Sequence, residues 1–169
     1  MKIVVLSDTH MPRKGRSLPV QLKADLENCD LIIHGGDWQT LDVYKELSLY
    51  GEVKGVYGNV DGEDIKKLFP EKIIVESGHV RIGVTHGHGK GLTTERRARA
   101  AFEDEEVQAV IFGHSHIPLL KKEGGILIFN PGSPTDKRRQ PRYSFGILTI
   151  EGGSVSARHV FFDKPVYEE

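Results

Sequence analysis

The first ten residues, MKIVVLSDTH (residues 1–10), contain the pattern that decides the fold. Ile3 to Leu6 form an uninterrupted apolar run rich in β-branched residues, as expected for a strand that is buried on both faces of a sheet. Asp8 and His10 follow almost at once, so the strand turns polar at its C-terminal end. In open α/β sheets this is the edge at which ligands bind.

Four more apolar runs end in the same way. Their polar ends are His34-Gly35-Gly36-Asp37, Gly58-Asn59-Val60-Asp61, His86-Gly87-His88 and Gly113-His114-Ser115-His116. A single Asp or His after a strand is more often a turn residue or a helix cap, but five such endings in one chain favour a shared site. About half of the 19 glycines lie beside these residues, where the backbone must turn sharply or approach a ligand closely.

The rest of the chain divides into short strands and amphipathic helices. The predicted strands are Lys2–Leu6, Leu31–His34, Val53–Val56, Lys72–Glu76, Val80–Thr85, Val107–Phe112, Ile126–Phe129, Tyr143–Ile150 and Val155–Phe161. The predicted helices are Leu18–Asn28 with Ser17 as N-cap, Leu41–Tyr50 after Thr40, and Thr94–Glu105. Alternation in the first half favours βαβ units and a parallel core. Glycine pairs at 124–125 and 152–153 favour antiparallel hairpins in the last third.

Composition excludes several classes of protein. We expect the 169 residues to form one domain, residues 1–169, because no linker or repeat interrupts them. A net charge of −1 argues against a basic nucleic-acid coat and an acidic disordered tail, and a single Cys excludes an internal disulfide. The strand-like N-terminus and the lack of an apolar stretch of about 18 residues indicate neither a signal peptide nor a membrane helix. We therefore expect a cytoplasmic protein.

The polar residues at the strand ends are typical of a metal site. Imidazole, carboxylate and amide ligands suit divalent ions such as Mn²⁺, Fe²⁺, Ni²⁺ or Zn²⁺, whereas the lack of Cys argues against a structural zinc or iron–sulfur site. The candidates are Asp8, His10, Asp37, Asn59, His86, His114 and His116. Seven ligands are too many for one tetrahedral ion and suit two ions that share a carboxylate, the usual arrangement for displacement at phosphorus. A Ser-His-Asp hydrolase is less favoured because Gly-x-Ser-x-Gly is absent.

Five ordered blocks, Asp8-Thr9-His10, Gly36-Asp37, Gly58-Asn59-Val60-Asp61, His86-Gly87 and Gly113-His114-Ser115-His116, resemble the signature of calcineurin-like metallophosphoesterases. Length and order most resemble the small bacterial and archaeal phosphodiesterases of that superfamily, over residues 1 to about 135. The resemblance implies an α/β fold, a four-layer αββα sandwich of two mixed β-sheets flanked by helices. It also implies a metal-dependent phosphodiesterase, in which a hydroxide that bridges two divalent metals attacks phosphorus.

The resemblance also implies how the ligands are divided. The first metal would take Asp8, His10, Asp37 and His116, and the second would take Asp37, Asn59, His86 and His114. Asp37 would bridge both ions, and Asp37, Asn59 and His86 are the residues assigned to catalysis. The cofactors would be two divalent ions per chain, with Mn²⁺ as the first choice and Ni²⁺, Fe²⁺ or Zn²⁺ as alternatives.

One residue departs from the family pattern. Where the third block usually carries a His that helps to protonate the leaving oxygen, this chain has Val60. Because a general acid contributes about 10²–10⁴-fold, we expect a preference for phosphodiesters over alkyl phosphomonoesters. Asp61, the usual partner of that His, is then expected to be a turn residue or a support for the ligands.

Two other functions stay open. One is a scaffold like the retromer subunit related to this family, disfavoured because none of the seven ligands is substituted. The other is a nucleotide pyrophosphatase or cyclic-nucleotide phosphodiesterase. The expected partner is a small phosphodiester, with no membrane, extended nucleic acid not favoured, and a homo-oligomer left open.

Several residues have no assigned role at this stage. His88 is either a substrate contact or part of a solvated loop, and His34 is expected to be a packed strand residue. The Lys137–Arg142 loop carries Arg138, Arg139 and Arg142, each of which either clamps a phosphate or is solvated.

Overall fold

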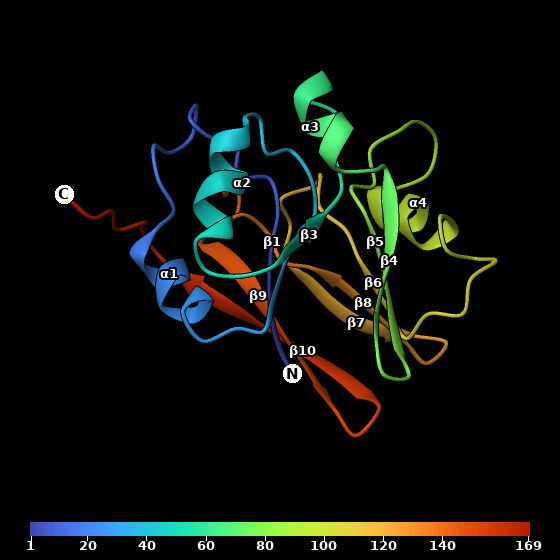
Figure 1. The fold of residues 1–169 in the computed structure, drawn as a ribbon. Coiled ribbons are helices and arrows are strands. Elements are labelled where there is room, and N and C mark those ends of the chain that lie inside the picture. Colours follow the sequence, from blue (N-terminus) through green and yellow to red (C-terminus); the bar gives the residue numbers. More distant parts are fainter.

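The computed structural model describes residues 1–169 as two five-stranded β-sheets that pack face to face, with helices on the outside (Figure 1). The strand orders are β10-β9-β1-β2-β3 and β4-β5-β6-β8-β7. The strands are β1 (Lys2–Leu6), β2 (Leu31–His34), β3 (Val53–Gly55), β4 (Lys72–Ser77), β5 (Val80–Thr85), β6 (Ala109–Ile111), β7 (Leu119–Glu123), β8 (Ile126–Asn130), β9 (Tyr143–Glu151) and β10 (Ser154–Phe162). The helices are α1 (Val20–Leu26), α2 (Leu41–Ser48), α3 (Glu63–Leu68) and α4 (Thr94–Ala100).

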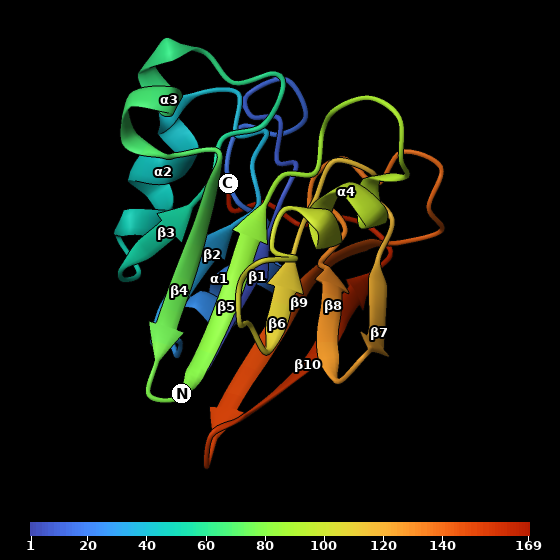
Figure 2. The same cartoon turned by 90° about the vertical axis from the view of Figure 1, so that its right-hand side faces the viewer.

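Each sheet contains three neighbouring parallel strands. In the first sheet β2 lies between β1 and β3, and Leu6 pairs with His34, which pairs with Gly55. In the second sheet β6 lies between β5 and β8, and Ile111 is level with Val84 and Phe129. These strands end at the same end of the molecule, the upper end in Figure 2. The polar segments that follow them are therefore brought together, as expected from the sequence.

The alternating side chains of β1 show how the layers form. Ile3 and Val5 are fully buried in the core between the sheets, together with Ile82 and Phe129 of the second sheet. Val4 and Leu6 point the other way, into a core shared with α1, α2 and α3. The outer face of the second sheet packs beneath α4, around Phe102. The result is the four-layer αββα sandwich that the resemblance implies.

The structure corrects the predicted elements at several places. Helix α1 begins at Val20 after Pro19, so Ser17 is not its N-cap, and β6 is confined to Ala109–Ile111. Strand β7 and helix α3 were not predicted. Three of the five residues of β7 are charged, because it is an edge strand, and α3 is too short to show helical periodicity. No helix is long and apolar enough to cross a membrane.

Candidate metal centre

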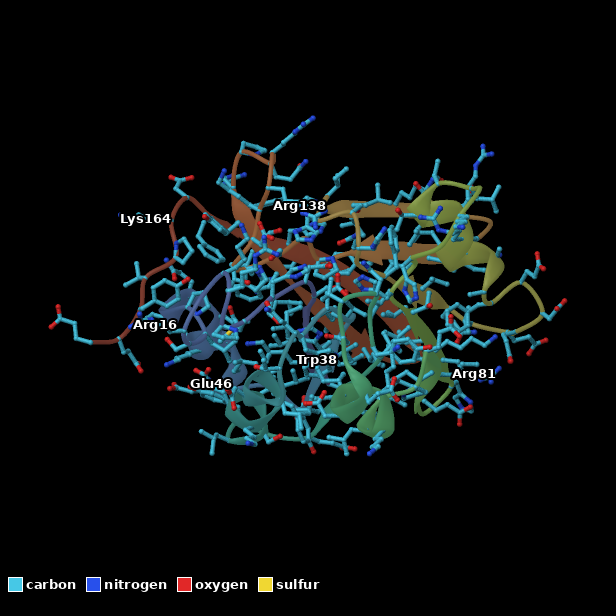
Figure 3. The ribbon with its side chains drawn as sticks, turned by 90° about the horizontal axis from the view of Figure 1, so that it is seen from above. Arg16, Trp38, Glu46, Arg81, Arg138 and Lys164 are labelled. Atoms are coloured by element: carbon cyan, nitrogen blue, oxygen red, sulfur yellow. The ribbon has the colours of Figure 1, made fainter.

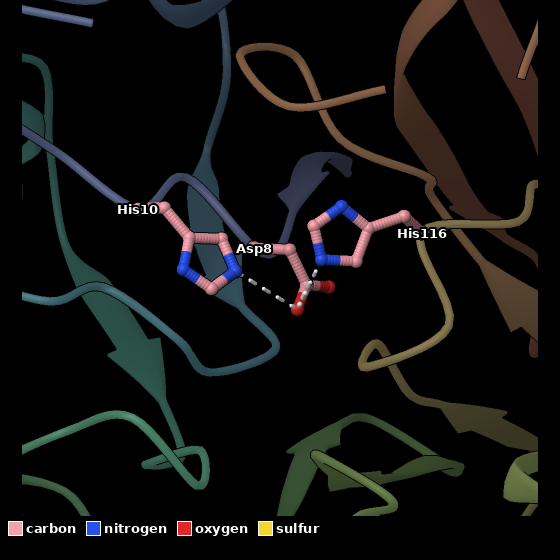
Figure 4. Close-up of side chains that lie close together, drawn as sticks. All are labelled: Asp8, His10 and His116. Carbon is pink, nitrogen blue, oxygen red and sulfur yellow. Dashed lines mark ion pairs between the residues drawn. The ribbon is translucent and has the colours of Figure 1, made fainter. Parts of the chain in front are cut away.

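The loops that follow β1, β2, β5 and β6 bring six candidate ligands into two groups. Asp8, His10 and His116 each offer a ligand atom, and these atoms lie within 4.8 Å of one another (Figure 4). The second group consists of Asp37, His86 and His114. Both groups follow the division that the family resemblance implies.

Only one of the two carboxylate oxygens of Asp8 accepts hydrogen bonds. Its Oδ2 accepts hydrogen bonds from Ser7 Oγ at 2.7 Å and from the backbone N–H of His114 at 3.0 Å. Its Oδ1 is buried without a hydrogen-bond partner, 3.4 Å from His116 Nε2 and 3.9 Å from His10 Nε2 (Figure 4). The bonded oxygen therefore aims the free one into the centre.

The two imidazoles beside Asp8 are also left without partners at the centre. The Nε2 atoms of His10 and His116 are buried and make no hydrogen bond. His116 donates its Nδ1–H to the backbone oxygen of Asp136, so a neutral ring presents a lone pair at Nε2. Burial lowers the pKa of His10, despite the nearby Asp8 and Asp37 carboxylates. Buried acceptors that face one another without a donor are unfavourable, and a divalent cation among them removes the conflict.

The second group places a buried imidazole beside a buried carboxylate. His86 hydrogen-bonds through Nδ1 to the backbone oxygen of Gly35 at 2.7 Å, and its Nε2 lies 3.2 Å from Asp37 Oδ2. Burial opposes protonation of His86, but Asp8 and Asp37 raise its pKa to about 9. Burial likewise opposes ionisation of Asp37, yet the His86 and Val60 N–H bonds lower its pKa to about 2. A metal ion here would take the place of the His86 proton.

Asp37 connects the two groups, and Asn59 joins two members of the second. The Oδ2 of Asp37 lies 3.5 Å from His10 Nε2 as well as 3.2 Å from His86 Nε2, so it faces imidazoles of both groups. The Oδ1 of Asn59 lies 3.1 Å from His86 Nε2 and 3.0 Å from His114 Nδ1. All seven residues named from the sequence therefore lie close together, and the Asp37 carboxylate contacts both groups.

The backbone of this centre is strained. Five of the seven candidate ligands have a positive φ, between 45° and 69°: Asp8, His10, Asp37, His114 and His116. A left-handed backbone costs an L-residue about 1–2 kcal/mol, and such strain persists where the surrounding structure fixes the residue for a function. No pattern in the sequence signals it.

Asp61 supports the ligand loops, which is one of the two roles expected from the sequence. Its Oδ2 accepts from the backbone N–H groups of Asp37 at 2.9 Å and Gly58 at 2.8 Å, and its Oδ1 accepts from that of Gln39 at 2.8 Å. The one carboxylate therefore ties the loop after β2 to the loop after β3. The signal was its place in the Gly58-Asn59-Val60-Asp61 block, but only the structure identifies its partners.

The histidines outside the ligand set have different surroundings. His34 is fully buried, stacks on Trp38 at 3.7 Å between ring centroids and accepts from Gly36 N at 3.1 Å, so it is the packed strand residue that was predicted. Burial holds its pKa well below 6.5. His88 is half-buried, with its ring 5.5 Å from that of His86 and its Nδ1 without a partner.

The segment after β8 is fastened to the ligand loops. Ser133 Oγ donates to the backbone oxygen of Asp8 at 2.8 Å, and Thr135 Oγ1 donates to that of Thr9 at 2.6 Å. With the His116–Asp136 bond, these contacts hold the long loop against the centre.

Comparisons with known proteins agree with this geometry. The profile described as the calcineurin-like phosphoesterase superfamily domain matches residues 1–153. A probable metallophosphoesterase of Methanocaldococcus jannaschii is 35% identical over 152 residues, 89% of this chain and 77% of the relative. A phosphodiesterase of the same archaeon is 32% identical over 144 residues, 78% of this chain and 83% of the relative.

Solved structures share the fold. A structure described as a novel archaeal phosphodiesterase has a TM-score of 0.72 at 28% identity, covering 96% of this chain and 100% of the other. Vps29 from Entamoeba histolytica in complex with zinc has a TM-score of 0.76 at 26% identity, covering 95% and 99%.

The close packing at Gly113 generates a first prediction. A Cβ at this position would lie 2.6 Å from Asp8 Oδ2 and would also collide with Ser7 Oγ, whereas a Cβ at Gly51 meets nothing within 4 Å. Gly113→Ala should displace the Asp8 carboxylate and weaken Mn²⁺ binding by about 10–100-fold in a calorimetric titration. Gly51→Ala is the control. Equal affinities in the two variants would show that Asp8 does not depend on this packing.

A second prediction concerns Asp61. In Asp61→Asn the amide –NH₂ cannot accept, so at least one N–H among Asp37, Gly58 and Gln39 loses its partner. We expect Mn²⁺ affinity to fall about 10–100-fold, although Asp61 faces no metal position, and unfolding free energy to fall by about 1–3 kcal/mol. The exposed Asp104→Asn is the matched control. Unchanged Mn²⁺ affinity in Asp61→Asn would contradict the supporting role.

Proposed function

The chain belongs to the calcineurin-like phosphoesterase superfamily, and we propose that it is a phosphodiesterase that works with two divalent metal ions. Its relatives and fold support a metal-dependent phosphoesterase. The observation that carries the two-ion proposal is the Asp37 carboxylate, whose Oδ2 lies 3.5 Å from His10 Nε2 and 3.2 Å from His86 Nε2. One carboxylate oxygen set between two groups of imidazoles suits a ligand shared by two cations.

The donor set determines which ions are proposed. Asp37 would be shared by both ions. The first ion would also take Asp8, His10 and His116, and the second would also take Asn59, His86 and His114. Nitrogen and oxygen ligands without thiolate favour Mn²⁺, with Ni²⁺, Fe²⁺ and Zn²⁺ as alternatives. When bound, such a pair of ions lowers the pKa of a water molecule and withdraws charge from phosphoryl oxygens.

On the substrate side of the centre, the side chain at position 60 determines whether a leaving group can be protonated. Val60 is 45% exposed and lines a cleft beside His10, so a substrate can reach it. Its side chain has no proton to donate to a leaving oxygen. Substrates with leaving groups that depart without a proton, such as activated aryl diesters, are therefore proposed ahead of alkyl phosphomonoesters.

The fold likeness to Vps29 is the only support for a scaffold function, and the complete ligand set favours the enzyme. A small phosphodiester substrate, rather than extended nucleic acid or a membrane, and a cytoplasmic location remain predictions. So does the choice between a simple diester and a nucleotide pyrophosphate or cyclic nucleotide.

The direct test is hydrolysis of bis(4-nitrophenyl) phosphate by the protein loaded with Mn²⁺. Asp37→Asn should lower kcat/KM by at least about 100-fold and should reduce the bound metal, because the bridging charge is lost. Asp42→Asn, an exposed carboxylate on α2, should leave both unchanged. If Asp37→Asn kept its metal and activity, the shared-ligand assignment would be wrong. If the wild type hydrolysed no diester but bound a protein partner, the scaffold function would replace the enzyme.

The absence of a proton donor generates a further prediction. Val60→His should raise the ratio of glycerol 2-phosphate hydrolysis to bis(4-nitrophenyl) phosphate hydrolysis by about 10²-fold, because an imidazole there protonates the poor alkoxide leaving group of the alkyl phosphomonoester, whereas 4-nitrophenolate leaves without a proton. Val60→Gln, which is polar but supplies no acidic proton, is the control. An unchanged ratio in Val60→His would show that Val60 does not set the preference.

A further inference from the structure

A cleft of about 240 Å³ opens directly beside the candidate metal centre. Its lining residues are His10, Arg13, Lys14, Val60, Asp136 and Arg138. Arg13 and Lys14 come from the loop after β1, whereas Arg138 comes from the loop after β8 and is labelled in Figure 3, which looks onto this end of the molecule. The cleft shares His10 with the metal centre, so a ligand in it is in reach of a group bound there.

The charges of this cleft are unbalanced. Lys14 Nζ lies 4.0 Å from Asp136 Oδ1, the only carboxylate in the lining. Arg13 and Arg138 also line the cleft, both are exposed, and neither has a carboxylate within 4.0 Å. Unpaired guanidinium groups around a small cleft suit an anion with several oxygens, above all phosphate, which arginine binds through two parallel hydrogen bonds.

Hydrogen bonds to the ligand segments hold the cations at this place. The backbone N–H of Lys14 donates to the oxygen of His10 at 2.8 Å. On the other side His116 bonds to the backbone oxygen of Asp136, two residues before Arg138. The turn that carries Arg138 is closed by the Gln140 N–H to Lys137 oxygen bond of 3.0 Å. The backbone that carries the three cations is therefore tied to the segments that carry His10 and His116.

The other two arginines of the loop do not share this position. Arg142 lies over the ring of Phe161, 4.4 Å from its centroid, at a separate cleft. Arg139 is exposed and lines neither cleft. Of the three arginines that the sequence offered as phosphate clamps, only Arg138 lines the cleft beside His10.

We propose that this cleft is a subsite for a second phosphate group, so that the preferred substrates carry two phosphorus centres close together. The cleft of about 240 Å³ has room for a phosphate group beside His10. The proposal rests on the proposed phosphodiesterase function, and it adds a substrate class to it. The second phosphate comes either from a terminal phosphate on a phosphodiester or from a phosphoanhydride.

Four substrates separate these sources. Bis(4-nitrophenyl) phosphate and the dinucleoside monophosphate ApA carry one phosphorus, pApA adds a terminal phosphate to ApA, and AppA is a phosphoanhydride. We expect the Mn²⁺-loaded wild type to prefer pApA or AppA to ApA. Arg13→Gln and Arg138→Gln should each lower kcat/KM for the preferred compound by about 10–100-fold and leave the one-phosphorus substrates within about threefold. Arg139→Gln should change none of the four.

Binding gives a readout that does not depend on turnover. The methylene analogue of AppA cannot be hydrolysed at its P–C–P bridge, and its affinity for the Mn²⁺-loaded protein should fall about 10–100-fold in Arg13→Gln and Arg138→Gln but not in Arg139→Gln. Equal loss for all four substrates, or no change in analogue affinity, would overturn the subsite. If the analogue bound as described and no substrate were hydrolysed, the subsite would stand and the phosphodiesterase function would fall.

Discussion

Two buried carboxylates, Asp8 and Asp37, face the imidazoles of His10, His86 and His116 at 3.2–3.9 Å, and the rest of the structure depends on how this charge is compensated. Burial opposes protonation of His86, yet the two carboxylates raise its pKa to about 9. The free acceptors Asp8 Oδ1, His10 Nε2 and His116 Nε2 are still left without a donor. Divalent cations satisfy all of these atoms together, so the centre is built for ions and not for a packed polar core.

The two-sheet fold brings the ligand residues together in a chain of only 169 residues. Parallel strands in both sheets end at one end of the molecule, so loops distant in sequence supply neighbouring ligands. The left-handed backbone at five ligands costs free energy locally, and the core between the sheets, which includes Ile3, Val5 and Phe129, offsets it. Asp61 and the Ser133–Asp136 segment then hold the ligand loops in register.

Much of this arrangement could be predicted from the sequence, because its signals are local. An apolar run followed by Asp or His indicates both a strand and a ligand. This pattern predicted β1, β2 and β5 with their bounds. It also predicted that the seven candidate ligands lie at one edge of the sheets. Features that depend on distant contacts could not be predicted. Several features arise only when segments distant in sequence meet. They are the partners of Asp61, the strained φ of Asp37, the charged edge strand β7, and the cleft that Arg13 and Arg138 both line.

The central claim is that Asp37 joins two metal ions, and anomalous scattering from crystals grown with Mn²⁺ tests it most directly. The account predicts two anomalous peaks per chain, about 3.5–4 Å apart, with the Asp37 carboxylate between them. Elemental analysis of the same protein should give two metal ions per chain. A single peak, or two peaks of which only one lies within bonding distance of Asp37, would contradict the account.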